Sequence, residues 1–223
     1  MTSAQILVAN LVVILLGGTL VGMVWNRRLS ACWSFTALLI VAMVTNRLVA
    51  WWPATFYTRQ FWTAKELALS AIEALVAIEL CVVTLRAFPR ARRLAIVAVT
   101  CVVVVAGLVI VGSSTPDYYA VVGIRMARAQ VGIAWAYATF IAVVWWFRLP
   151  LGQFEARIVL GFALYLSAYG SLLSVLGWLG WRFYPYVAAL DPAASAATIG
   201  LWLLAAWQPE AFPARRAIAT ARP

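Results

Sequence analysis

The sequence is organised as a series of long apolar runs that are separated by short segments bearing arginine. A helix needs about 20 consecutive apolar residues to cross the hydrocarbon core of a bilayer. Seven runs of this kind occur, at about Gln5–Trp25, Ala31–Trp51, Trp62–Arg86, Leu94–Gly112, Val121–Phe147, Glu155–Gly177 and Val187–Trp207. The sequence therefore predicts an all-α polytopic membrane protein with seven transmembrane helices.

Composition limits what else the chain can contain. Of its 223 residues, 65% are hydrophobic and 11% are charged, whereas about 25% are charged in soluble domains. Seven spans of about 22 residues leave only short loops and tails, so no separate soluble catalytic or nucleic-acid-binding domain fits. We expect a single transmembrane domain over residues 1–207, followed by a tail over residues 208–223 that is rich in Pro, Ala and Arg.

Basic residues and tryptophans predict how the spans lie in the membrane. Cytoplasmic loops carry an excess of Lys and Arg, and eleven basic residues follow spans one, three, five and seven, against six on the opposite side. This places the N-terminus outside and the C-terminus in the cytoplasm. Ten of the twelve tryptophans fall at predicted span ends, where Trp favours the headgroup level; Trp135 and Trp202 are the two inside spans.

Charged residues inside predicted spans are the first candidate site, because a charge in the bilayer needs a partner, water or a neutral form. Span three carries Glu66 and Glu73 on one stripe and Glu79 on another, and span five begins with Arg125 and Arg128. One interpretation is a polar pocket between these spans for a zwitterionic or cationic ligand, or for the relay of protons through a buried carboxylate. The other is a set of ion pairs that fixes helix packing.

Small and aromatic residues suggest further contacts within the bundle. Tyr165 and Tyr169 alternate with glycines in span six, and together with Trp135 and Trp202 they are candidates for an apolar groove or for tight helix packing. Gly18 and Gly22 form a GxxxG pattern, which allows two helix backbones to approach closely. Asp191-Pro192 in span seven is either a helix N-cap or a functional acid.

Several classes of site are excluded by residues that the chain lacks. It contains no histidine, and its three cysteines are widely separated without CxxC spacing, so we predict no metal centre and no haem or chlorophyll held through histidine. A retinal protein of seven helices needs a lysine inside its last span, and the only lysine here is Lys65. The net charge of +10 lies mostly between apolar runs and does not indicate nucleic-acid binding.

Two hypotheses of function follow. With no nucleophile–base pair we expect no enzyme, and the leading hypothesis is an accessory or scaffold subunit of a larger, bioenergetic membrane complex. No cofactor is firmly implied, although a lipid, quinone or carotenoid fits apolar helix grooves. The alternative is a small-ligand sensor or carrier that uses the charged pocket. Because arginine and alanine dominate over lysine, we expect a bacterial protein of the cytoplasmic (inner) membrane.

Overall fold

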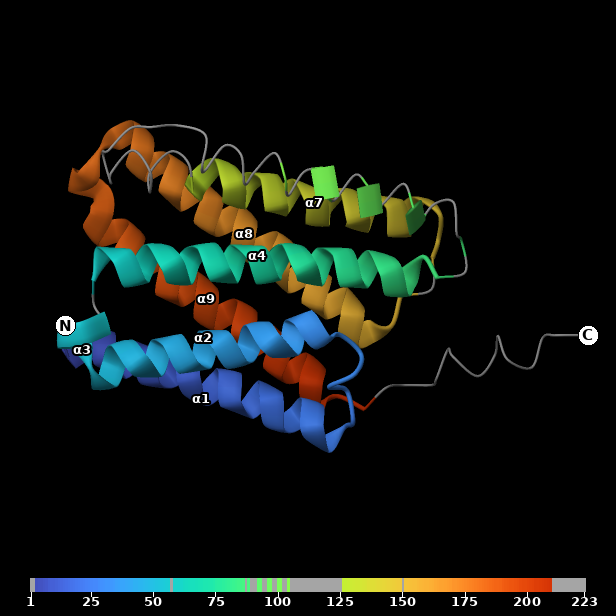
Figure 1. Ribbon diagram of the computed structural model, residues 1–223, viewed down its shortest axis with the longest axis horizontal. Helices are drawn as coiled ribbons and strands as arrows, with labels where there is room; N and C mark the ends of the chain where they lie inside the picture. Colours follow the sequence, from blue (N-terminus) through green and yellow to red (C-terminus); the bar gives the residue numbers. More distant parts are fainter. Residues whose placement is uncertain are drawn as a thin grey trace, which may run out of the picture.

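The structure is a computed structural model, and every element that it describes is helical (Figure 1). It describes residues 3–56, 58–86, 88, 92–93, 96–97, 100–101, 104, 126–149 and 151–209. The elements are α1 (Ser3–Trp25), α2 (Trp33–Trp51), α3 (Pro53–Phe56), α4 (Arg59–Thr84), α7 (Ala127–Trp146), α8 (Gln153–Leu179), the short 3₁₀ helix η2 (Trp181–Phe183) and α9 (Tyr184–Trp207).

Helices occupy six of the seven predicted spans. Five of them, α2, α4, α7, α8 and α9, are long and apolar enough to cross a membrane. The apolar stretch of α1, Asn10–Trp25, is shorter. These lengths support a multi-pass membrane protein. Most of the predicted span Leu94–Gly112 lies outside the described residues, as does nearly all of the predicted tail.

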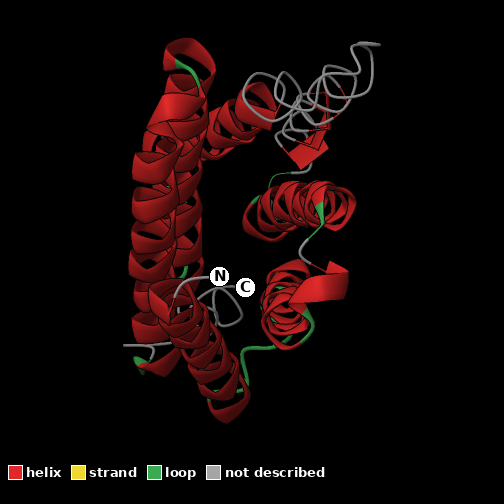
Figure 2. Cartoon of the chain, turned by 90° about the vertical axis from the view of Figure 1, so that its left-hand side faces the viewer, coloured by secondary structure: helices red, strands yellow, loops and turns green. Residues whose placement is uncertain are grey.

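The six long helices form a closed ring of neighbours. In order around the ring, α1 packs on α2, α2 on α4, α4 on α7, α7 on α8, α8 on α9, and α9 returns to α1. In Figure 1 the long helices run broadly along the long axis of the molecule, with α8 and α9 inclined to the others, and Figure 2 shows the same helices from one end. The ring brings helices that are far apart in sequence around one centre.

Local signals explain where several helices begin and end. The hydroxyl of Thr58 accepts a hydrogen bond from the backbone N–H of Phe61 at 3.2 Å, which caps the start of α4. Helix α8 ends at Gly180, whose φ of 83° is a conformation that glycine adopts without steric cost. Pro185 lies in the first turn of α9, where its missing N–H is not needed.

Two sequence interpretations can be compared directly with α1 and α9. The GxxxG pattern does provide a close approach: the indole N–H of Trp207 donates to the carbonyl of Gly18 at 3.1 Å, and a Cβ at Gly22 would lie 2.8 Å from that indole nitrogen. The N-cap interpretation of Asp191 is wrong, because α9 starts at Tyr184 and continues through Pro192.

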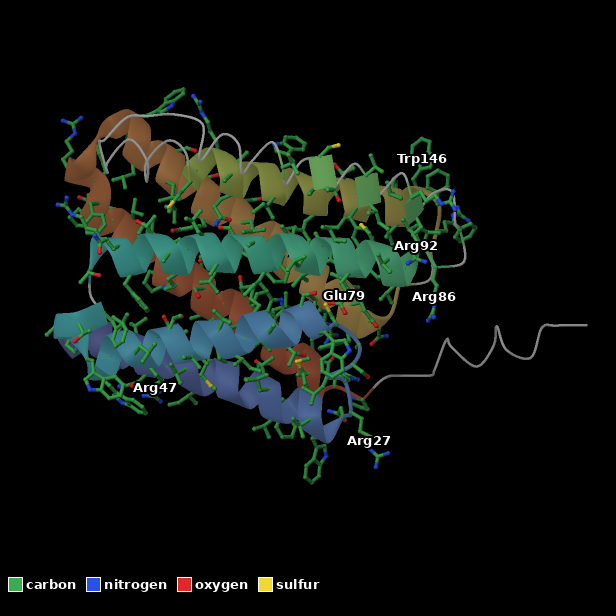
Figure 3. The ribbon with its side chains drawn as sticks, in the orientation of Figure 1. Arg27, Arg47, Glu79, Arg86, Arg92 and Trp146 are labelled. Carbon is green, nitrogen blue, oxygen red and sulfur yellow. The ribbon has the colours of Figure 1, made fainter. Side chains whose placement is uncertain are left out.

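Arginines gather at one end of the bundle. Figure 3 shows Arg27, Arg86 and Arg92 at the end that also carries Trp146, and Arg47 at the opposite end. Three of the predicted cytoplasmic arginines, Arg27, Arg86 and Arg92, therefore share one end of the described fold. Large side chains fill the centre of the ring on that side, where Phe35 packs edge-to-face on Phe162 and Trp202 at centroid distances of 6.1 and 5.1 Å.

Candidate functional site

A cavity of about 910 Å³ lies at the centre of the ring, and all six long helices contribute to its wall. This volume is typical of small-molecule sites, which span about 300–1,000 Å³. The ionisable and amide side chains that line it are Asn46, Lys65, Glu66, Glu73, Gln130 and Asp191. Its aromatic side chains are Trp62, Phe162, Tyr165, Tyr169, Tyr184 and Trp202.

The described lining is acidic. It contains three carboxylates, on Glu66, Glu73 and Asp191, and one ammonium group, on Lys65. Lys65 Nζ lies 3.6 Å from Glu66 Oε1, which makes them an ion pair. Lys65 also acts electrostatically on Asp191, so Glu73 is the lining carboxylate that has no basic neighbour among the described residues.

Two tyrosines of α8 connect the acidic residues of α4 and α9. The hydroxyl of Tyr169 donates to Glu66 Oε2 at 3.4 Å, and the hydroxyl of Tyr165 donates to Asp191 Oδ1 at 3.5 Å. The two rings lie parallel, with centroids 5.7 Å apart. Since both donors are neutral, they orient the carboxylates without cancelling their charge.

Three buried polar atoms of the lining residues have no hydrogen-bond partner among the described residues: Glu73 Oε2, Gln130 Oε1 and Trp202 Nε1. Glu73 is 7% exposed and Gln130 is 4% exposed. The amide nitrogen of Gln130 already donates to Ser70 Oγ at 2.9 Å, which fixes its orientation between α7 and α4. A buried polar atom without a partner costs free energy, so Glu73 Oε2 and Gln130 Oε1 are acceptors available to a hydrogen-bond donor, whereas Trp202 Nε1 faces Gly161 of α8.

The carboxylate of Glu79 has a different role. It accepts hydrogen bonds from the backbone N–H groups of Trp33 at 2.9 Å and Ser34 at 2.8 Å, and from the hydroxyl of Ser34. Cys32 at the N-cap of α2 makes no cap of its own. Glu79 thus supplies from α4 the negative charge that the N-terminus of α2 favours, and it lies apart from the cavity lining.

Cys32, which lies at the start of α2, does not provide a reactive thiol. Burial, together with the nearby carboxylate of Glu79, raises the pKa of the Cys32 thiol well above its ordinary value. A helix N-terminus commonly favours the thiolate. Here the carboxylate occupies that position instead, so the thiol stays protonated and packs as an apolar group.

We expect Glu79→Ala to destabilise the fold by about 1–2 kcal/mol, because capping interactions have this magnitude. Glu79→Gln keeps a hydrogen-bond acceptor and loses only the charge, so its effect should be smaller. Thermal unfolding of both variants in mild detergent measures the difference. Unchanged stability of Glu79→Ala would contradict the capping role.

The opposite kind of cap closes the end of α9. Arg28, from the loop after α1, is 8% exposed and donates to the carbonyls of Ala205 at 2.6 Å and Gln208 at 2.8 Å. Its guanidinium carbon lies 5.1 Å from the centre of the Phe154 ring. A cation at a helix C-terminus pairs with the last carbonyls and with the helix dipole.

The structure brings some of the predicted site residues together and separates others. Glu66, Glu73, Tyr165, Tyr169 and Trp202 line one cavity. The side chains of Arg128 and Trp135 are exposed on α7 and are not among its described lining residues. Arg125 lies outside the described residues, and Lys65, rather than Arg128, pairs with Glu66.

Sequence reasoning assigned neither Asp191 nor Trp62 to the site. Asp191 stands next to a proline in an apolar run, so the sequence favoured neither a helix N-cap nor a functional acid at this position. The structure places Asp191 inside the continuous helix α9. Trp62 was assigned to an interfacial belt, yet it lines the cavity. A charge inside a predicted span was the available signal for Asp191, whereas Trp62 offered no such signal.

Comparison with known proteins gives no relative to guide the assignment. No protein-family model, no curated protein and no solved structure matches the chain. Among the described residues, no group of three or more His, Cys, Asp or Glu side chains is placed to hold a metal ion. The chemistry of the site therefore rests on the cavity itself.

Proposed function

We propose that this chain is a seven-span protein of the bacterial inner membrane, with its N-terminus outside and its C-terminus in the cytoplasm, that binds a small organic cation as a sensor or carrier. The observation that carries the proposal is the cavity of about 910 Å³ with three carboxylates and one ammonium group in its described lining. The protein needs no catalytic group for this role.

The walls of the cavity suit a cation that also carries apolar surface. Carboxylates on Glu73 and Asp191 provide the charge, and the aromatic rings of Trp62 and Tyr165 line the same cavity, where a ring face attracts a cation. A metal ion would need oxygen ligands gathered within its coordination sphere. A neutral quinone or carotenoid would remove the carboxylates from water without compensating their charge. An organic cation carries both the positive charge that the carboxylates attract and the apolar surface that packs on the cavity wall.

The accessory-subunit hypothesis stays a prediction. Exposed apolar side chains such as Trp135, Trp145 and Trp146 are what a partner subunit would cover, but a lipid bilayer requires the same surface. No feature of the described helices favours a partner over lipid, whereas the cavity favours a ligand directly.

The test uses phenyltrimethylammonium as the cation and tert-butylbenzene, its neutral isostere, as the matched control. Isothermal titration calorimetry of the full chain in mild detergent should show binding of the cation and at least tenfold weaker binding of the isostere. Glu73→Gln and Asp191→Asn should each weaken cation binding about tenfold, which corresponds to about 1.4 kcal/mol. Equal binding of cation and isostere would overturn the proposal.

A matched control variant is available on α8. Glu155→Gln makes the same chemical change as Glu73→Gln, in the first turn of α8 and away from the cavity lining. It should leave cation binding unchanged. Uptake of the cation into proteoliposomes would then identify a carrier, and binding without uptake would identify a sensor.

A further inference from the structure

Glu73 differs from the other two acidic residues of the cavity in its charged surroundings. Lys65 forms an ion pair with Glu66 and also acts electrostatically on Asp191. Among the described residues, the charge that acts on Glu73 is the carboxylate of Glu66, which is a second negative charge. Glu73 is also 7% exposed. An ionised Glu73 is therefore a buried charge that no described group compensates, whereas the protonated form has no charge to compensate.

The tyrosine hydroxyls around Glu73 donate to other acceptors. From α7, the hydroxyl of Tyr137 donates to the backbone carbonyl of Glu73 at 2.8 Å. From α8, the hydroxyls of Tyr165 and Tyr169 donate to the other two acidic residues of the lining. Helix α2 adds the neutral amide of Asn46, and the described lining residues of α1 are apolar. None of these neighbours supplies the positive charge that an ionised Glu73 needs.

The side chain of Gln130 on α7 also suits a protonated Glu73. It lies within hydrogen-bonding reach of the Glu73 carboxyl, and its amide nitrogen donates to Ser70 Oγ at 2.9 Å. This leaves Gln130 Oε1 and Glu73 Oε2 as two buried oxygens without a partner among the described residues. An ionised carboxylate only accepts hydrogen bonds, whereas a protonated one also donates. A proton on Glu73 therefore adds the donor that this pair of oxygens lacks.

Resting on the proposed cation site, we propose that the cation displaces a proton from Glu73. In the empty protein the carboxyl of Glu73 holds this proton. When the cation binds, the O–H bond breaks, its electron pair stays on the carboxylate, and the proton passes to water. One positive charge enters the cavity and one leaves it, so the buried carboxylate is compensated in the bound state. A carrier that works by this exchange moves a proton and a cation in opposite directions.

The experiment counts the protons that are released when the full chain binds phenyltrimethylammonium in mild detergent. The quaternary nitrogen of this probe has no proton of its own to lose. Isothermal titration calorimetry at neutral pH, in buffers that differ in their enthalpy of ionisation, should show release of about one proton for each cation bound. Raising the pH removes the competing proton, so the affinity should rise with pH, by up to about tenfold per pH unit.

Variants assign the proton to one carboxyl. In Glu73→Gln the release of protons and the pH dependence of binding should disappear, because the amide has no proton that titrates. This variant matches the protonated acid in size and charge, so we expect it to fold. Asp191→Asn also removes a carboxylate from the lining, and it should bind more weakly but still release the proton. Glu155→Gln should match the unmodified protein in affinity and in proton release.

The results that would overturn the exchange differ from those that would overturn the cation site. Binding of phenyltrimethylammonium by the unmodified protein without release of a proton would overturn this inference and leave the cation site standing. Proton release that persists in Glu73→Gln would overturn the assignment to Glu73. Absence of binding at every pH tested would overturn both the exchange and the proposed function.

Discussion

Replacing Arg28 with methionine is expected to destabilise the protein by about 3 kcal/mol, since two hydrogen bonds from a charged donor are lost and each contributes about 1.5–3 kcal/mol. Methionine retains apolar contact with Phe154 but cannot donate to the carbonyls of Ala205 and Gln208. For a chain of this size, 3 kcal/mol corresponds to a fall of about 6–12 °C in the midpoint of thermal unfolding.

Arg27→Met is the matched control for this experiment. Arg27 is the preceding residue, it is exposed, and Figure 3 shows its side chain pointing away from the bundle. Both substitutions remove one positive charge from the same loop, so any effect on membrane orientation is common to both. We expect Arg27→Met to unfold within about 1 °C of the unmodified protein. Equal destabilisation by the two variants would contradict the capping role of Arg28.

The second large effect is expected for Gly161→Ala, at the contact between α8 and α9. A Cβ at this position would lie 2.3 Å from Trp202 Nε1 and 3.0 Å from Trp202 Cε2. The indole cannot move away easily, because it packs on Phe35 and Phe162 at centroid distances of 5.1 and 4.8 Å. Overpacking of this kind costs about 1–3 kcal/mol, and it should also weaken cation binding, because Trp202 lines the cavity.

Gly200→Ala makes the identical substitution where there is room. Nothing lies within 4 Å of a Cβ built at Gly200 of α9, and alanine favours a helix over glycine by up to about 1 kcal/mol. Thermal unfolding should therefore show Gly161→Ala below the unmodified protein and Gly200→Ala at or above it. If both variants are as stable as the unmodified protein, the close packing of Trp202 on Gly161 is wrong.

The positions of the helices could be predicted from hydropathy alone. In α2, for example, the predicted run Ala31–Trp51 and the observed helix Trp33–Trp51 end at the same residue. Burial in lipid forces each apolar run to satisfy its backbone hydrogen bonds internally, so a helix is the structure that such a run adopts. The first residue of a helix was harder to predict, because the capping side chain can come from another helix, as Glu79 of α4 does at the start of α2.

The candidate site could be predicted only in part. Glu66 and Glu73 were found because seven residues complete nearly two turns, which places both on one face of α4. Their partners could not be found in this way, since Lys65 rather than Arg128 pairs with Glu66, and Asp191 reaches the same cavity from α9. Helical periodicity shows which residues share one face of a helix. It does not show which faces of different helices are in contact.

Hydropathy and the placement of charged residues are enough to show that the chain is built from long apolar helices, where these helices lie along the chain, and which of them carry charge. From the sequence, each arginine is equally a surface charge or a buried helix cap. Each glutamate is equally a member of an ion pair or part of a ligand-binding pocket. Tertiary structure decided between these roles: closing the ring buried Arg28 at the end of α9, set Glu79 on the start of α2 and left Glu73 facing a cavity. The physical reason is that the cost of a buried charge depends on the groups around it, and those groups come from helices that only the packing brings together.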